Sequence, residues 1–208
     1  MTLEEQVGRG LVSMGIAVSP AQRERLAAHL ELIAKWNRVH NLTAIRETSQ
    51  MVTLHLLDSL SVLPQLEGAR TIADVGTGPG FPGIPIAIVR DDAAVTLVES
   101  SHKKCAFLQQ AKTELGLANV IIACERVEHL QPAAPFDAVI SRAFSDLPDF
   151  ITQAGHLIAP GGKLIAMKGV YPFDEIARVP STHRVSQVLE LHVPSLEATR
   201  HLVVLEAA

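Results

Sequence analysis

The sequence predicts an α/β fold in which a helical N-terminal extension, residues 1–65, packs on a domain built around one mostly parallel sheet, residues 66–208. Three observations predict it. Short apolar stretches alternate with helix-like stretches from Arg70 onward, which is typical of parallel strands covered by helices. A glycine-rich turn follows the first of these apolar stretches. The last two expected strands are joined by a short turn that leaves no room for a crossover helix.

The first 65 residues are expected to be helical. One helix start is predicted at Ser19, which acts as the cap, with Pro20 in the first turn and Gln22 completing a capping box. Apolar residues follow at helical spacing until Asn41-Leu42-Thr43 ends the pattern. A further helix is expected from about 47 to 63, and its inward-facing residues are Met51, Leu54, Leu57, Leu60 and Leu63.

The rest of the chain is expected to form seven strands, at 71–75, 94–98, 119–123, 138–141, 163–167, 184–191 and 201–205. Helices are expected between them at 82–90, 103–115, 147–158 and roughly 173–177. The last two strands are separated by a polar turn with Pro194 and Ser195, so they are expected to pair antiparallel.

A glycine-rich segment links the first strand to the first helix of the sheet domain, and it reads Asp74-Val75-Gly76-Thr77-Gly78-Pro79-Gly80-Phe81-Pro82-Gly83. Glycines permit positive φ and let a ligand approach the backbone without meeting a Cβ. The helix start beyond them adds unpaired N–H groups and a partial positive charge. The segment therefore predicts a nucleotide-cofactor site, and the alternative is a turn that merely closes tightly.

The composition is that of a globular protein, with 208 residues, 48% hydrophobic, 19% charged and a net charge of −4. No apolar run approaches the roughly 20 residues of a membrane-spanning helix, and no secretory signal is visible at the start. Cys105 and Cys124 lie far apart, so we expect reduced cysteines in a cytoplasmic protein rather than a disulfide framework. A nucleic-acid partner would require a local basic patch, because the whole chain is slightly acidic.

A carboxylate stands where an adenosine ribose would need one. Glu99 ends the second expected strand, 19 residues after Gly80, and can accept hydrogen bonds from both ribose hydroxyls. NAD and S-adenosylmethionine both satisfy this pattern. Three features favour S-adenosylmethionine: the two final strands without a crossover, the lack of room for a substrate domain, and Arg126-Val127-Glu128 after the third strand. The expected sheet thus resembles that of the Rossmann-like class I S-adenosylmethionine-dependent methyltransferases, where adenine binds after the third strand.

Several separated motifs resemble the RsmG (GidB) family of bacterial methyltransferases, and the resemblance covers almost the whole chain. They are the glycine segment from Gly76 to Ile84, Asn41-Leu42-Thr43, His55-Leu56-Leu57-Asp58-Ser59, Ile140-Ser141-Arg142-Ala143-Phe144, Lys168-Gly169 and Arg200-His201-Leu202-Val203-Val204. The resemblance implies methyl transfer from S-adenosylmethionine to N7 of a guanine (guanine 527) in the 530 loop of 16S ribosomal RNA, with the small ribosomal subunit as partner. It implies cofactor contacts at Gly76, Phe81, Val127, Glu128 and Arg142. It also implies substrate-side roles for His55 and Lys168.

Methylation of guanine N7 agrees with what the sequence lacks. Ser141-Arg142-Ala143-Phe144 stands where enzymes that methylate exocyclic amines carry an Asn/Asp-Pro-Pro-aromatic loop. Cys105 is expected on a helix and Cys124 at a strand end, so neither is expected to act as a nucleophile. Guanine N7 has a free in-plane lone pair and no proton to lose. Alignment alone can supply ~7–11 kcal/mol, and no general base is required.

The role of Arg142 stays open among a contact with a guanine edge, a bidentate contact with the cofactor carboxylate and a surface salt bridge. Phe144 either stacks on a base or packs in the core. His55 and Asp58 lie one helical turn apart and predict either a hydrogen-bonded pair or a structural clamp.

Two other functions fit parts of the sequence. One is a non-catalytic module that retains the fold and binds RNA or an assembly partner, and the other is a small NAD-linked reductase. The intact glycine segment together with Glu99 favours the enzyme over the first. No metal site is expected, and the absence of a sustained heptad favours a monomer.

Overall fold

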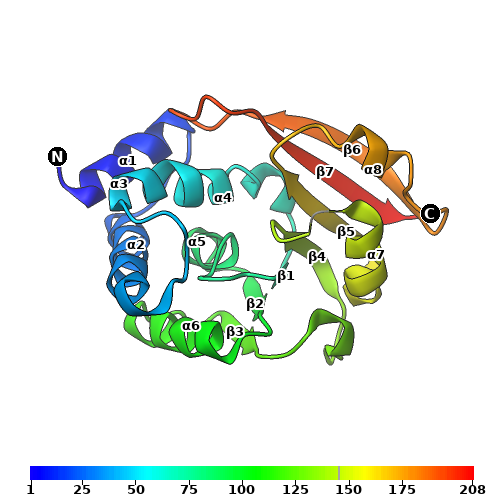
Figure 1. Cartoon of the computed structure of the whole chain (residues 1–208), viewed down its shortest axis with the longest axis horizontal. Helices are drawn as coiled ribbons and strands as arrows, with labels where there is room; N and C mark the ends of the chain where they lie inside the picture. Colours follow the sequence, from blue (N-terminus) through cyan, green and yellow to red (C-terminus); the bar gives the residue numbers. More distant parts are fainter. Residues whose placement is uncertain (145) are drawn as a thin grey trace.

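The structure is a computed structural model that describes residues 1–144 and 146–208. Within these residues, seven strands form one sheet in the order β3-β2-β1-β4-β5-β7-β6 (Figure 1). Strands β1 to β5 run parallel, and β7 pairs antiparallel with both β5 and β6. The predicted fold class and the antiparallel pairing of the last two strands are therefore confirmed.

The strands lie close to their predicted positions. They are β1 (Thr71–Val75), β2 (Ala94–Val98), β3 (Val120–Ala123), β4 (Phe136–Ser141), β5 (Ile158–Lys168), β6 (His183–Leu191) and β7 (Arg200–Ala207). The largest difference is at β5, which begins at Ile158 rather than at 163. Phe136 of β4 pairs with Ile158 before the register shifts, and this extra pairing extends both strands.

The helices are α1 (Leu3–Ser13), α2 (Pro20–His40), α3 (Thr48–Met51), α4 (Asp58–Leu60), α5 (Gly83–Val89), α6 (His102–Glu114), α7 (Leu147–Ala154) and α8 (Phe173–Ile176). Short 3-10 segments are η2 (Leu63–Leu66), η3 (Val127–His129) and η4 (Gly155–Leu157). The helix predicted at 47–63 is divided, because a π-helical stretch, η1 (Val52–Leu57), links α3 to α4. Among the described residues, no helix is long and apolar enough to cross a membrane.

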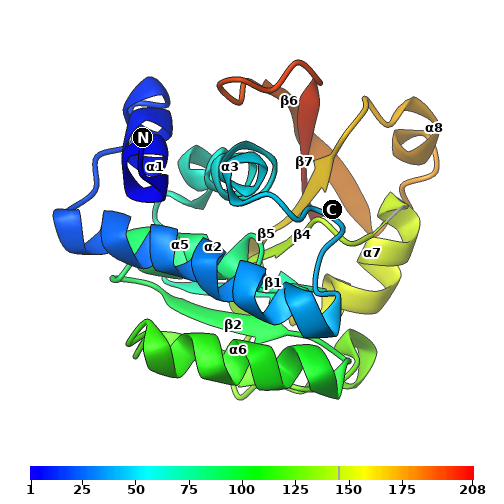
Figure 2. The same ribbon diagram turned by 60° about the vertical axis from the view of Figure 1, so that its left-hand side comes forward.

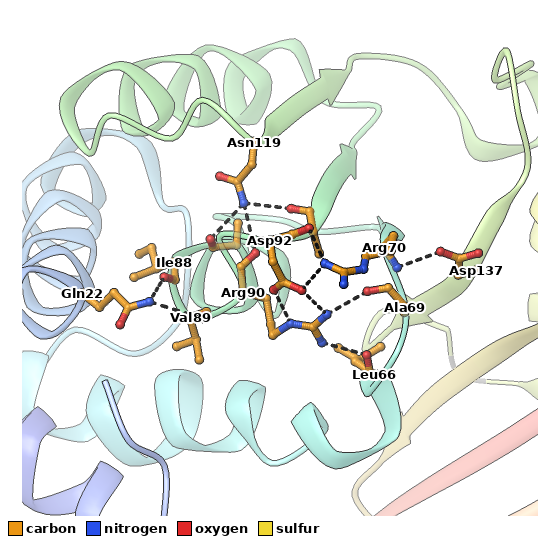
Figure 3. Close-up of polar contacts among 12 residues, drawn as sticks. Gln22, Leu66, Ala69, Arg70, Ile88, Val89, Arg90, Asp92, Asn119 and Asp137 are labelled. Atoms are coloured by element: carbon orange, nitrogen blue, oxygen red, sulfur yellow. Dashed lines mark hydrogen bonds and ion pairs between the residues drawn. The ribbon is translucent and has the colours of Figure 1, made fainter. Parts of the chain in front are cut away.

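The start of α2 follows the predicted capping box. Ser19 Oγ accepts from the backbone N–H of Gln22 at 3.2 Å, and Gln22 Oε1 accepts from the N–H of Ser19 at 2.8 Å. Gln22 also donates from Nε2 to the carbonyl oxygens of Ile88 and Val89 at the end of α5, as Figure 3 shows. The cap that begins α2 therefore also fixes α2 against α5.

The two faces of the sheet bury separate apolar clusters. On β1, Ile72 belongs to a cluster shared with α1, α2, α4, α5 and α6, whereas Ala73 and Val75 pack with α7. Figures 1 and 2 show the N-terminal helices gathered on one side and α7 and α8 on the other. Both faces of the parallel strands are covered, which explains their continuous apolar sequence.

The edge of the sheet where the parallel strands begin is closed by a polar network (Figure 3). The Arg90 guanidinium donates to the carbonyl oxygens of Leu66 and Ala69 at 2.8 and 2.9 Å. The Asp92 carboxylate accepts hydrogen bonds from Arg90 and from Arg70, so it connects the end of α5 with the residue that precedes β1. Ligands are therefore expected at the opposite edge, where the parallel strands end.

The two cysteines form a disulfide, which corrects the expectation of separate, reduced thiols. Cys105 lies in the first turn of α6 and Cys124 directly follows β3, and their Cα atoms are 5.9 Å apart. The segment between them, which corresponds to a sequence separation of 19, contains the rest of α6 and the strand β3 that returns beside it. The sequence did not predict this pairing, because the two cysteines are far apart along the chain and form no CxxC motif.

Candidate active site

The glycine segment adopts the backbone that its sequence predicts. Gly76, Gly78 and Gly80 have φ of 70°, 60° and 96°. A Cβ at Gly76 would lie 2.6 Å from Cβ of Ala143, so that position must stay bare for the chain to fold. A Cβ at Gly78 would meet no atom within 4 Å, so the space above this residue is open to a ligand.

Asp74 holds the two ends of the glycine segment together from beneath. Its Oδ2 accepts from Thr77 Oγ1 at 2.5 Å and from the backbone N–H of Gly83 at 2.7 Å. The side chain is fully buried, and burial raises the pKa of Asp74 to about 6, against the lowering effect of these hydrogen bonds. Its Oδ1 has no hydrogen-bond partner among the residues that the structure describes.

Glu99 lies against the open part of the same segment. Its Oε2 accepts from the N–H of Gly78 at 3.0 Å and its Oε1 from the N–H of Ser101 at 2.9 Å. Lys104 Nζ is 3.7 Å from Oε2. Each carboxylate oxygen can accept a second hydrogen bond, so Glu99 can still receive ribose hydroxyls.

A first pocket, called here the loop pocket, opens beside Glu99 at the ends of β1, β2 and β4. It is lined by Val75, Gly76, Val98, Glu99, Ser100, Glu125, Arg126, Val127, Glu128, Ala143, Phe144 and Gln153. Four predicted cofactor residues, Gly76, Glu99, Val127 and Glu128, therefore lie together. The Glu128 carboxylate is hydrogen-bonded to Arg126, and this contact lowers the pKa of Glu128.

A second pocket, called here the basic pocket, is lined by Leu54, His55, Asp58, Arg142, Met167, Lys168, Gly169 and Arg200. His55 and Lys168, which were expected on the substrate side, meet in it with Arg142, whose role the sequence left open between cofactor and guanine. Three cationic side chains and one carboxylate line the pocket, whereas the whole chain carries a net charge of −4. Cationic side chains thus gather here in a chain that is acidic overall, although Asp58 and Glu175 neutralise part of their charge.

Asp58 bridges two arginines in the basic pocket. Its Oδ2 accepts from Nη1 of Arg142 at 2.9 Å and its Oδ1 from Nε of Arg200 at 3.1 Å. Of the two alternatives for His55 and Asp58, the hydrogen-bonded pair is not formed, whereas Asp58 does act as a structural clamp from helix to sheet, joining α4 to the end of β4 and to β7. His55 Nε2 is instead hydrogen-bonded to Thr43 Oγ1 at 2.8 Å, and the arginines take both oxygens of Asp58.

Phe81 is enclosed between two histidines. Its ring centroid lies 4.9 Å from that of His29 and 4.8 Å from that of His55, and Cζ of Arg142 is 5.6 Å from it. Burial lowers the pKa of both His29 and His55 to about 4, and the charge of Arg142 contributes at His55. Phe81 is only 2% exposed and does not line the loop pocket, so the structure does not bring this predicted cofactor residue to the pocket surface.

Lys168 is a buried cation with fixed partners. Its Nζ lies 2.6 Å from Oε2 of Glu175 and donates to the carbonyl oxygen of Phe144 at 3.1 Å. Glu175 also accepts from the N–H of Leu147 at 2.9 Å. Lys168 thus connects the end of β5 with α8 and with the loop after β4.

The two pockets adjoin through the loop that follows β4. Arg142 lines the basic pocket, while the next two residues, Ala143 and Phe144, line the loop pocket. Phe144 also packs against Phe150 of α7, with ring centroids 5.1 Å apart. The two pockets therefore lie on two sides of the same short segment.

The sheet order, the bare Gly78 and the carboxylate of Glu99 fit an adenosine cofactor and define a class I S-adenosylmethionine-dependent methyltransferase. The fold is similar to that of the O-methyltransferase TomG from Streptomyces achromogenes in complex with S-adenosylmethionine. The TM-score is 0.64 at 18% identity, over 100% of this chain and 99% of TomG. S-adenosylmethionine is the cofactor of this class.

Residues 22–203 match the GidB family, described as rRNA small subunit methyltransferase G. The chain is 57% identical to ribosomal RNA small subunit methyltransferase G of Aromatoleum aromaticum, over 99% of this chain and 97% of that protein. It is 54% identical to the protein of the same name in Nitrosospira multiformis, over 98% and 97% of the two chains. The chain therefore belongs to the GidB family, and the predicted family is confirmed.

Several residues of the site carried no predicted role. Arg200 forms an ion pair with Asp58, and Glu175 forms one with Lys168. Thr43 is hydrogen-bonded to His55 and orients it. Thr43 and Arg200 stand inside motifs that mark the family resemblance, which is the one signal that could have pointed to them. The pairing of Arg200 with Asp58 spans 142 residues and leaves no local pattern.

Proposed function

We propose that this protein transfers the methyl group of S-adenosylmethionine to small-subunit ribosomal RNA, at N7 of a guanine in the 530 loop. The relatives named above are small-subunit ribosomal RNA methyltransferases, and their names support the class of substrate. The choice of guanine N7 rests on the family resemblance and on the composition of the basic pocket.

The observation that carries the proposal is the junction between the two pockets. Arg142 stands on the basic side and Ala143 on the loop side of one short segment. A cofactor held against Glu99 and a base held beside Arg142 would face each other there. Proximity of this kind is the main requirement for in-line methyl transfer.

Within the proposal, the loop pocket binds the adenosine part of the cofactor. Glu99 accepts the ribose hydroxyls, and Val127 and Glu128 lie beside the adenine. In the glycine segment, Gly76 lines the loop pocket and Gly78 is partly exposed, so both can contact the cofactor, whereas Gly80 and Phe81 are buried. Arg142, for which the family resemblance also implies a cofactor contact, lines the basic pocket and is assigned to the guanine side. S-adenosylmethionine supplies a methyl group on a positively charged sulfur.

The basic pocket suits a reaction without a general base. Asp58, the one carboxylate that lines it in the described residues, is held by two guanidiniums. Arg142 can present its planar guanidinium to the O6 edge of guanine, next to N7. His55 stays neutral at neutral pH, because burial lowers its pKa to about 4. Lys168 positions the loop after β4 through the Phe144 carbonyl.

The direct test is methyl transfer from labelled S-adenosylmethionine to small ribosomal subunits isolated from a strain that lacks the modification. Nucleoside analysis should then yield labelled 7-methylguanosine located in the 530 loop. Label in any other nucleoside, or no label at all, would contradict the proposal.

If the protein is instead a non-catalytic module, its cofactor site is expected not to bind S-adenosylmethionine. Calorimetry with S-adenosylmethionine distinguishes the two, since a retired site gives no heat. The geometry favours the enzyme, because the positive φ at Gly78 and the Glu99 contact are both retained.

We further propose that the protein acts as a cytoplasmic monomer. Sedimentation of the purified chain should give the mass of one copy, and cell fractionation should recover it with the ribosomes. A stable dimer would contradict the first statement.

A further inference from the structure

Two exposed aromatic rings lie side by side just after β5. The ring centroids of Tyr171 and Phe173 are 4.2 Å apart, and Tyr171 also meets His201 of β7 edge-on, at 5.5 Å and 82°. Tyr171 is 39% exposed and Phe173 is 73% exposed. Two neighbouring rings are therefore presented to solvent on a side of the molecule close to the end of β5.

This exposure is unusual for the chain, which has only one Trp, one Tyr and six Phe. In the part of the chain that the structure describes, the exposed large hydrophobic residues are Met1, Val12, Val39, Ile121, Val170, Tyr171 and Phe173. The aromatic members of this set are Tyr171 and Phe173, and Val170 stands next to them. Single exposed apolar residues are common, but a cluster of them indicates a binding surface.

The backbone holds the two rings in place before any partner arrives. Pro172 lies between them with φ −91° and ψ 63°, and the N–H of Phe173 donates to the carbonyl oxygen of Tyr171 at 3.1 Å. This is an inverse γ-turn, which brings residues two apart to the same side. Pro172 itself is buried and anchors the turn. Ordering the rings therefore costs little when a ligand binds.

The pair continues the basic pocket. Lys168 and Gly169 line that pocket and lead directly into the aromatic turn, and Arg200 of the pocket precedes His201, which touches Tyr171. We propose that Tyr171 and Phe173 form a stacking platform for an unpaired RNA base next to the methylated guanine. This rests on the proposed function.

The chemistry of the surroundings favours a base over a protein side chain. A guanine that enters the basic pocket must leave its stack, and its neighbour then has an uncovered face. Aromatic side chains beside a cationic groove are the usual partners of such bases. Arg142, Arg200 and Lys168 supply the cations here, although Asp58 and Glu175 neutralise part of their charge.

The test is steady-state methyl transfer to small subunits that lack the modification. Phe173→Leu keeps an apolar side chain but removes the ring, and Tyr171→Leu does the same for its neighbour. Each should raise KM for the subunit by about ten-fold, the effect of losing one stacked base. The value of kcat at saturating subunit and the affinity for S-adenosylmethionine should stay unchanged. Phe173→Trp should keep the wild-type KM.

Ile121→Ala is the matched control, since Ile121 is 56% exposed on β3, at the other end of the sheet order. It should not change KM. If both Leu variants retain the wild-type KM, stacking is wrong. If the wild-type protein transfers no methyl group to the subunit, the proposed function fails instead, so the two failures are distinguishable.

A photoreactive benzophenone side chain at position 173 identifies the class of partner directly. Crosslinks to 16S ribosomal RNA within a few nucleotides of the modified guanine are expected. Crosslinks confined to a ribosomal protein would overturn the proposal and assign this surface to protein docking.

Discussion

Arg142 lies between the two pockets, because it lines the basic pocket while the next two residues, Ala143 and Phe144, line the loop pocket. We predict that Arg142→Ala lowers kcat/KM for the small subunit by about 10²-fold, as expected when a reacting group is misplaced. Affinity for S-adenosylmethionine should change little, since the guanidinium lies on the basic side. Transfer kinetics and calorimetry on the same preparation measure both effects.

Arg184→Ala is a suitable control for that substitution. Arg184 forms an ion pair with Glu206 at 2.8 Å between β6 and β7, and it lines neither pocket. Its loss should leave transfer unchanged. If Arg142→Ala instead abolishes cofactor binding, the guanidinium holds the cofactor carboxylate and not the guanine.

At the scale of residues, the sequence motifs indicated which residues gather at the site, but not which side chains bind each other. His55 and Lys168, expected on the substrate side from the family resemblance, line one pocket together with Arg142, and their roles stay predictions. The local spacing of His55 and Asp58 suggested a pair, yet Asp58 binds two arginines that come from β4 and β7. Contacts between distant segments leave no periodic trace, so helical spacing gave the wrong partner here.

At the scale of elements, the glycine segment can be tested by one substitution. We predict that Gly78→Val abolishes binding of S-adenosylmethionine while the protein still folds. An added Cβ at Gly78 contacts no protein atom within 4 Å and would occupy the space proposed for the ligand. The positive φ of 60° should cost ~1–3 kcal/mol of stability. Calorimetry measures the affinity and thermal unfolding measures the stability.

Gly116→Val separates backbone strain from loss of the ligand. Gly116 has φ of 64° at the end of α6, and an added Cβ would also meet nothing within 4 Å. The Gly116→Val variant should lose about as much stability as Gly78→Val and should keep the wild-type affinity for S-adenosylmethionine. Equal loss of affinity in both variants would argue against the assignment of the glycine segment.

The disulfide between α6 and the segment after β3 makes a second prediction at this scale. A bond that closes a loop of 19 residues should stabilise the fold by ~3 kcal/mol. Adding a thiol reductant should therefore lower the unfolding midpoint by roughly 6–12 °C in a chain of this size. Cys124→Ser should unfold at the lower temperature in both conditions. A midpoint that does not respond to reductant in the wild-type protein would show that the bond does not form.

The elements themselves were largely predictable, because short apolar runs between helical runs have few other solutions. β1 and β2 begin and end at the predicted residues. The division of the helix at 47–63 was not predictable, and it changes which residues face inward. Leu54, which was expected to face inward, lines the basic pocket, whereas Leu56 of η1 is buried in the core. The register shift that lengthens β5 depends on its partner β4, which local sequence does not describe.

At the scale of the whole molecule, the N-terminal helices help to build the site. His29 of α2 and His55 of η1 enclose Phe81 of the glycine segment, and Asp58 of α4 holds Arg142 and Arg200. The two parts of the chain also share one apolar cluster on the same face of the sheet. The basic pocket therefore depends on residues 1–65 as much as on the sheet.

The same histidines couple the stability of the whole fold to pH. Burial lowers the pKa of His29 and of His55 from 6.5 to about 4, so their stabilising contribution is complete above pH 6.5 and is lost as the pH falls to 4. Asp74 acts in the opposite direction. Burial raises its pKa from 3.8 to about 6, so its contribution is complete below 3.8 and is lost as the pH rises through 6.

Between pH 6 and pH 4 the unfolded chain binds protons at His29 and His55, whereas the folded chain binds one at Asp74. For these groups the unfolded chain therefore holds about one more proton than the folded chain. We therefore predict that these three groups make the free energy of unfolding fall by ~1.4 kcal/mol per pH unit as the pH decreases across this range. His183, whose pKa is also lowered by burial, adds to the fall. His29→Gln, which can still donate to the Pro79 carbonyl, should nearly flatten the dependence. Asp74→Asn, which can still accept from Thr77 and Gly83, should roughly double it. Urea unfolding at constant ionic strength from pH 8 to pH 4 measures all three slopes. Equal slopes in the three proteins would mean that the protonation of neither His29 nor Asp74 is coupled to folding. The two substitutions are expected to change the slope in opposite directions, so a general loss of stability cannot explain both results.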